Sequence, residues 1–205
     1  QFIAEGRTDL KIYEMEHPDI LLWAVWCIQQ YAKMVSREQC REKYGDLLAE
    51  IIDFIRKGGH NNLHLHSNGL VYSNGTDKAI TWMNSHANGR PIIARTGYIV
   101  ETNALWYNAL RFTADLLGEK ESSLFTEDIN ALADTTAQSF VNTFLNEQGY
   151  LLDYVDGHMM DWSVRPNMIF AAAFDYSPLN ARQKKGVIDI CTKELLTPKG
   201  LRSLS

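Results

Sequence analysis

Hydrophobic residues recur at helical spacing along most of the chain, in segments of two alternating kinds. In one kind the apolar residues face nearly every direction, which is typical of a helix buried on all sides. In the other kind they form a single stripe, which is typical of a half-exposed helix. The pattern predicts six helices, with the first, third and fifth of the buried kind: 18–35, 36–57, 99–117, 126–144, 166–174 and 177–196.

Local signals at several helix ends agree with this pattern. Ser36 is followed three residues later by Gln39, which is the spacing of a capping box, and Gly58–Gly59 ends the same helix. Thr126 is the predicted cap of the fourth helix, and Thr197–Pro198 stops the sixth.

Two long connections interrupt the helices, one of about 40 residues up to Tyr98 and one of about 20 residues up to Arg165. Connections of this length are usually functional. Each contains a hairpin signal: strands 63–66 and 70–72 flank Asn68–Gly69, and strand 150–154 precedes Asp156–Gly157. Both long connections lead from a half-exposed helix to a buried one, so they should lie at one end of the molecule and form a pocket there.

The alternation of buried and one-sided helices predicts an all-α fold in which an inner ring is wrapped by an outer ring, an α/α toroid. Three helical hairpins make about half of a six-hairpin ring, with small β-hairpins in the long loops. No linker divides the chain, so residues 1–205 are predicted to form one partial domain.

Composition and charge exclude several classes of partner. The net charge is −5 and no run of Lys or Arg exceeds two residues, so nucleic acid is not expected to bind. The longest apolar stretch, 20–28, is too short to cross a membrane, and the first residues carry no signal-peptide pattern. Cys27, Cys40 and Cys191 are expected to be thiols. We therefore expect a cytoplasmic protein that binds neither nucleic acid nor membranes.

Trp, Arg, Glu and Asn side chains concentrate where the longer connection meets the third helix. They lie in 81–84, at Arg95 and in 101–108. Aromatic faces cover the C–H side of a pyranose, and Arg, Asn and carboxylates hydrogen-bond its hydroxyls, so these residues favour a sugar site. The same pattern also allows Trp82 and Trp106 to be core aromatics and Glu101 to be a helix-opening carboxylate.

A metal site is weakly indicated. His64 and His66 would share one face of a strand, near His60, but no Cys or third carboxylate has a companion spacing. His158 with Asp156 and Asp161 is no stronger. We predict neither a metal nor a cofactor.

Several ordered segments resemble the amylo-alpha-1,6-glucosidase module of glycogen debranching enzymes. The resemblance covers nearly the whole chain and begins weakly at 18–23. Its segments are TWMN at 81–84, GRP at 89–91, RTGY at 95–98, ETNALWYNAL at 101–110, RPNMIFA at 165–171 and ELLTPKGLRSL at 194–204.

The resemblance implies an (α/α)6 toroid of the six-hairpin glycosidase type. It also implies hydrolysis of α-1,6-linked glucose at branch points of glycogen or another α-glucan, with inversion, by two carboxylic acids and without a cofactor. The residues carried over for substrate binding are Trp82, Arg95, Asn103, Trp106, Asp19, Asp161 and Arg165. The sequence also allows a structural role for two of them: Arg165 as the ion-pair partner of Asp161, and Asp19 as a carboxylate of a first helical turn.

Two departures from the family pattern affect the catalytic residues. The resemblance implies an Asp that acts as the general acid where this chain has Asn84, and an amide cannot donate a proton near neutral pH. Either Glu101 is the acid, or the protein is an impaired homologue that binds glucan. The family's general base lies beyond the segment that ends near Ser205, so the chain is expected to supply one side of the site. Alone it should be inactive and should self-associate through apolar surface.

Overall fold

A computed structural model describes residues 17–75, 78–118 and 123–205. It is mostly helical with small antiparallel sheets, which agrees with the predicted all-α class in its coarse form. Every predicted helix has a counterpart, and a 3₁₀ turn, η2 (Pro166–Met168), precedes the fifth. The helices are α1 (Asp19–Ala32), α2 (Arg37–Arg56), α3 (Val100–Gly118), α4 (Leu124–Phe144), α5 (Ile169–Ala173) and α6 (Ala181–Leu195).

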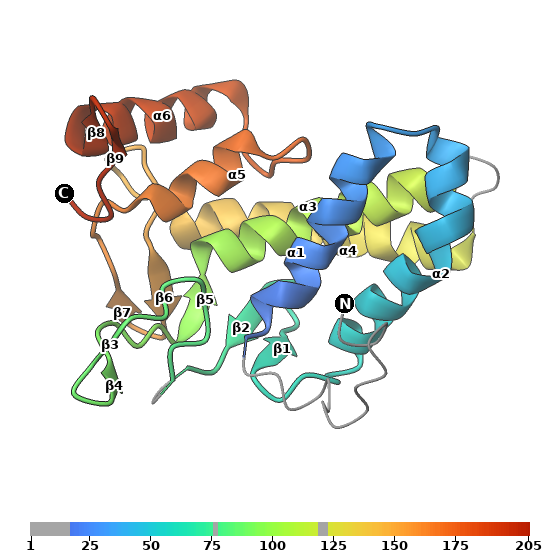
Figure 1. The fold of residues 1–205 in the computed structure, drawn as a ribbon, viewed down its shortest axis with the longest axis horizontal. Coiled ribbons are helices and arrows are strands. Elements are labelled where there is room, and N and C mark those ends of the chain that lie inside the picture. Colours follow the sequence, from blue (N-terminus) through green and yellow to red (C-terminus); the bar gives the residue numbers. More distant parts are fainter. Residues whose placement is uncertain (1–16, 76–77, 119–122) are drawn as a thin grey trace.

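The third helix, α3, runs through the middle of the molecule and contacts α1, α2, α4 and α5 (Figure 1). Nearly all of its residues are buried, including Trp106, Leu110 and Phe112. The prediction of a helix covered on all sides is therefore confirmed for α3, which is the central helix of the fold.

The one-sided prediction is confirmed for α2, α4 and α6, each of which buries a single face. The capping box of α2 is also confirmed, because the Ser36 hydroxyl accepts from the Gln39 N–H at 3.1 Å. The predicted cap of α4 is wrong by three residues. Ser123 is the N-cap, and Thr126 is its partner inside the first turn. The last helix begins at Ala181 because Asn180 is its N-cap.

The prediction of burial on all sides is wrong for α5, in which Ala171 is buried but Ala173 is exposed. It is also wrong for α1. Ile20 is 44 % exposed, Cys27 is exposed, and Trp23 and Trp26 are only partly buried. This helix packs on α2 and α3, and the ring centroids of Trp23 and Phe170 are 5.3 Å apart. Apolar residues all round a helix show that it can be covered, but the elements packed against it decide how much of it is.

Short antiparallel strands fill the long connections. One sheet has the order β1-β2-β5-β6-β7, and two-stranded pairs are formed by β3 with β4 and by β8 with β9. The strands are β1 (Leu63–Leu65), β2 (Val71–Ser73), β3 (His86–Ala87), β4 (Arg90–Pro91), β5 (Gly97–Ile99), β6 (Tyr154–Asp156), β7 (Met159–Met160), β8 (Leu196–Thr197) and β9 (Gly200–Leu201).

The hairpin around Asn68–Gly69 is confirmed, whereas the second hairpin starts later than predicted, at Tyr154. Strand β5 has no counterpart among the predicted elements, and it joins the two hairpins by pairing with β2 and with β6. Gly97 makes the second pairing possible: its φ is +111°, and a Cβ there would lie 2.3 Å from the Val155 carbonyl oxygen. The long connections are therefore held together by one sheet.

The cysteines and the helix lengths add two findings. Cys27, Cys40 and Cys191 are all free, as predicted. In the part of the chain that the structure describes, no helix is both long enough and apolar enough to cross a membrane.

We expect the 205-residue chain to self-associate, because large apolar side chains remain on its surface. Ile92 is 62 % exposed, Trp82 46 % and Trp162 43 %. Exposed apolar area of this kind favours association in water. Sedimentation velocity should show species heavier than a monomer, together with binding of a hydrophobic dye. A compact monomer that binds no dye would contradict this prediction.

Candidate functional site

An arginine and a glutamate form a buried ion pair where the longer connection enters α3. Arg95 lies just before β5 and Glu101 lies in the first turn of α3, with side chains 2 % and 1 % exposed. Both carboxylate oxygens of Glu101 accept from the guanidinium, Oε1 from Nη1 and Oε2 from Nη2, the latter at 2.7 Å. This two-point contact fixes Arg95 against the start of the helix.

A third buried charged residue, Asp153, contacts this pair and was not among the site residues predicted from the sequence. Its Oδ2 is 3.0 Å from Arg95 Nε, and its backbone oxygen accepts from Arg95 Nη2 at 3.2 Å. Its Oδ1 accepts from the Asn167 side chain at 2.7 Å. One signal could have identified it: Asp153 is the single carboxylate in the largely apolar run 150–155, and a buried carboxylate needs a partner.

Arg165 extends the cluster toward the surface. Its Nε is 3.5 Å from Asp153 Oδ2 and 3.8 Å from Asp161 Oδ2. The ion pair with Asp161 that the sequence suggested is therefore present, but the more deeply buried Asp153 is the closer partner. Arg95, Glu101, Asp153, Arg165 and Asp161 together are called the charge cluster below.

Burial dominates the electrostatics of the acidic groups. It raises the pKa of Asp153 to about 6, with Glu101 adding repulsion, while Arg95 and then Arg165 pull the other way. The pKa of Asp19, buried at the start of α1, is also raised, first by burial and then by the charge of Glu101. The folded protein thus holds the Asp153 proton more tightly than the unfolded chain does. The contribution of this Asp153 proton to the free energy of unfolding is complete below about pH 4 and is lost as the pH rises through about 6.

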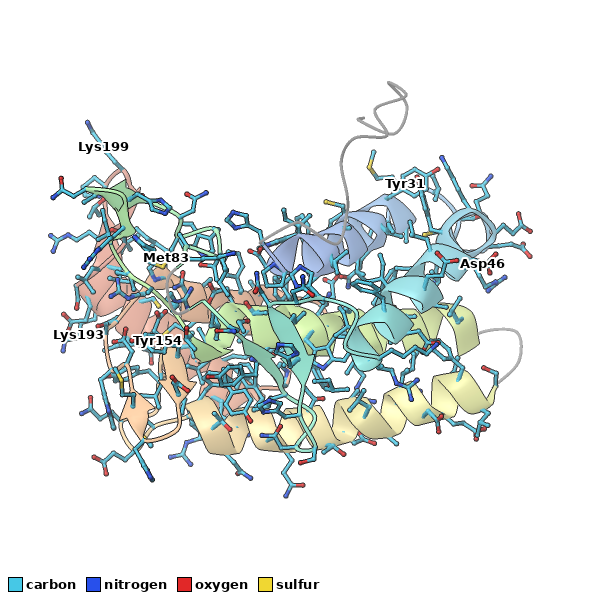
Figure 2. The ribbon with its side chains drawn as sticks, turned by 90° about the horizontal axis from the view of Figure 1, so that it is seen from below. Tyr31, Asp46, Met83, Tyr154, Lys193 and Lys199 are labelled. Carbon is cyan, nitrogen blue, oxygen red and sulfur yellow. The ribbon has the colours of Figure 1, made fainter. Side chains whose placement is uncertain are left out.

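A pocket of about 340 Å³ opens beside the charge cluster. Arg165 belongs to both, and the half-exposed indole of Trp82 forms part of the wall. Met83, also in the wall, lies at the end of the molecule that holds Tyr154, far from Tyr31 at the outer end of α1 (Figure 2). The residues that line the pocket are Trp82, Met83, Ser85, Ile92, Ile93, Arg165, Ser203 and Leu204.

The 81–84 segment is tied to the charge cluster at two points. Thr81 Oγ1 accepts from Arg95 Nη1 at 3.5 Å, and Met83 Sδ accepts from the Asn167 amide at 3.3 Å. Asn84 follows as an exposed residue whose backbone oxygen lies 2.8 Å from His86 Nδ1. The structure therefore pairs Arg95 with Glu101 and links Arg95 to Thr81, the residue before Trp82, while Trp82 itself lines the pocket with Arg165.

Asn103 and Trp106 lie instead in the core, where the structure explains both without a ligand. The Asn103 amide bonds the Val71 N–H at 2.8 Å and the Val71 carbonyl at 2.9 Å. Trp106 Nε1 donates to the Gly69 carbonyl at 3.1 Å, and neither side chain has exposed surface. These two residues anchor the β1–β2 hairpin to α3, and neither lines the pocket to which Trp82 and Arg165 belong.

The histidines of the first hairpin make local contacts. His60 Nδ1 accepts from the Asn62 N–H at 3.0 Å, and His66 Nδ1 is 2.8 Å from the Tyr98 hydroxyl. Within 17–75, 78–118 and 123–205, no group of three or more His, Cys, Asp or Glu is placed to hold a metal ion.

Comparison with known proteins adds one match. The family model described as amylo-alpha-1,6-glucosidase matches residues 11–205. This span includes the charge cluster and every residue that lines the pocket. A search of curated proteins found no match to the chain.

Proposed function

Because the chain belongs to the amylo-alpha-1,6-glucosidase family, we propose that it supplies one side of a site that hydrolyses α-1,6-linked glucose at branch points of glycogen or a similar α-glucan. One observation carries the proposal: Trp82 and Arg165 line the same pocket, and the buried carboxylate of Asp153 forms an ion pair with the arginine. An aromatic face and a guanidinium offer a glucosyl unit an apolar contact and hydrogen-bond donors.

The proposal includes the toroid. A central helix covered on all sides and one-sided helices around it are what an inner and an outer ring require. The two long connections meet in one sheet beside the pocket, as expected if they lie at one end of the ring. A stored glucan as substrate would place the protein in the cytoplasm.

We propose an inverting reaction, in which one carboxylic acid protonates the leaving oxygen and a carboxylate activates water. The two groups must then lie about 6.5–9.5 Å apart. From this chain, Trp82 would pack on the sugar and Arg165 would bind its hydroxyls. The sequence left Glu101 as the candidate acid, but both of its oxygens are bonded to Arg95, which favours a role in holding that arginine.

A second function, glucan binding without hydrolysis, is favoured by the lack of a carboxylate among the described residues of the pocket wall. Among the described residues that line it, none is Asp or Glu. Asn84 stands where the family usually has its acid, and an amide has no proton to give. On this alternative, Asn84→Asp in the full-length protein should create or raise glucose release from a branched limit dextrin.

We expect Trp82→Ala to weaken binding of branched limit dextrin by about tenfold, because it removes the aromatic wall of the pocket. The dissociation constant and the rate of glucose release should be measured separately on the full-length protein. Trp162→Ala is the matched control, since Trp162 is similarly exposed and does not line the pocket.

The outcomes separate the two functions. Binding with glucose release supports the hydrolase, and binding without release supports the binding protein. Failure of the wild-type protein to bind any branched glucan would overturn both. Equal affinity of Trp82→Ala and wild type would show that the sugar binds elsewhere.

A further inference from the structure

Arg165 is the single charged side chain among the described residues that line the pocket. Only 8 % of its side chain is exposed, so its position depends on buried partners. A sugar-binding guanidinium has to present its donors in a fixed orientation, because hydrogen bonds weaken steeply when misaligned.

Asp153 lies between Arg165 and a second arginine. Its Oδ2 is 3.5 Å from Arg165 Nε and 3.0 Å from Arg95 Nε. Without the negative charge at Asp153, the two guanidinium groups would repel each other, and Glu101 is already bonded through both oxygens to Arg95. Among the described residues, Asp153 is therefore the carboxylate that forms ion pairs with both arginines.

The other carboxylate oxygen of Asp153 connects to the pocket wall. Asn167 donates to Asp153 Oδ1 at 2.7 Å, and the same amide nitrogen is 3.3 Å from the sulfur of Met83, which lines the pocket. Asp153 itself does not line the pocket, so its effect on a ligand passes through Arg165 and Met83.

We propose that Asp153 is a positioning residue for glucan recognition, which fixes the guanidinium of Arg165 in the pocket and ties it to the Arg95–Glu101 pair. The inference rests on the proposed function, because the ligand is the same branched α-glucan. A purely structural Asp153 would alter stability but would not act on affinity through Arg165.

A double-mutant cycle on the full-length protein tests this, with binding of branched limit dextrin as the readout. Asp153→Asn keeps the shape and removes the charge, and Arg165→Gln removes the guanidinium. Each should raise the dissociation constant about tenfold. The double variant should bind no more weakly than Arg165→Gln alone. Where turnover is measurable, KM should rise in Asp153→Asn with kcat little changed.

Asn167→Ser provides a second variant that keeps the Asp153 charge and removes the amide that fixes Oδ1. It should weaken binding less than Asp153→Asn, and it carries the test if Asp153→Asn does not fold. Additive losses of affinity for Asp153 and Arg165, or unchanged affinity in both single variants and in Asn167→Ser, would overturn the inference. Wild-type protein that binds no branched glucan would instead overturn the proposed function.

Discussion

Replacement of Arg95 by alanine is expected to lower the free energy of unfolding by about 3–5 kcal/mol. The loss is large because Glu101 and Asp153, each with a side chain 1 % exposed, would remain buried without their shared cation. For a domain of this size, each kcal/mol corresponds to roughly 2–4 °C, so the midpoint of thermal unfolding should fall by about 6–20 °C. Thermal and denaturant unfolding followed by circular dichroism would measure the change.

Arg37→Ala is the matched control for this substitution. Arg37 pairs with Asp115 at 2.9 Å, but the two side chains are 40 % and 49 % exposed. An exposed pair contributes about 1 kcal/mol or less. If Arg95→Ala proved no more destabilising than Arg37→Ala, the charge cluster would not be the structural element described above.

Glu101→Gln in the full-length protein is expected to reduce glucose release from branched limit dextrin by about 100-fold or more. A general acid replaced by an amide can no longer protonate the leaving oxygen. If Glu101 acts instead by holding Arg95, the amide removes one of the two charged contacts and places an N–H against the guanidinium. Both roles predict the loss, and Glu50→Gln, at an exposed position of α2, should leave turnover unchanged.

An activated substrate separates the two roles of Glu101. Fluoride leaves glucosyl fluoride without the protonation that a glucan oxygen requires. A Glu101→Gln enzyme that lacks only its acid should therefore still hydrolyse α-glucosyl fluoride, whereas one with a displaced Arg95 should be slow on both substrates. Unchanged turnover of limit dextrin would remove Glu101 from the site.

Much of the helical fold could be predicted because local patterns determine it. The apolar run of α3 and the stripe of α2 report directly on burial, and Ser36 with Gln39 marks a helix start within one turn. The errors arise where the burial of a helix depends on the elements packed against it. The sequence of α1 is as apolar as that of α3, but fewer described helices pack on it, and Ile20 remains exposed.

The candidate site could be predicted only in its local part. Arg95 and Glu101 are six residues apart, and the structure pairs them. Asp153 is 58 residues from Arg95 in the sequence and lies beside it because β5 pairs with β6, a pairing that no local sequence pattern predicts. Asn103 and Trp106 show a second limit, because the same polar atoms can serve a sugar or a neighbouring backbone, and only the three-dimensional contacts decide between them.

The pairing of β5 with both β2 and β6 also has a consequence for the order of folding. Contacts between distant segments require loop closure, which costs conformational entropy before the contacts stabilise the chain. We therefore expect this sheet to form late in folding. In a chain synthesised from its N-terminus, α1, α2 and the β1–β2 hairpin emerge before residues 154–156. Arg95 and Glu101 would then meet before Asp153 arrives, and the pocket would take shape in one of the last steps.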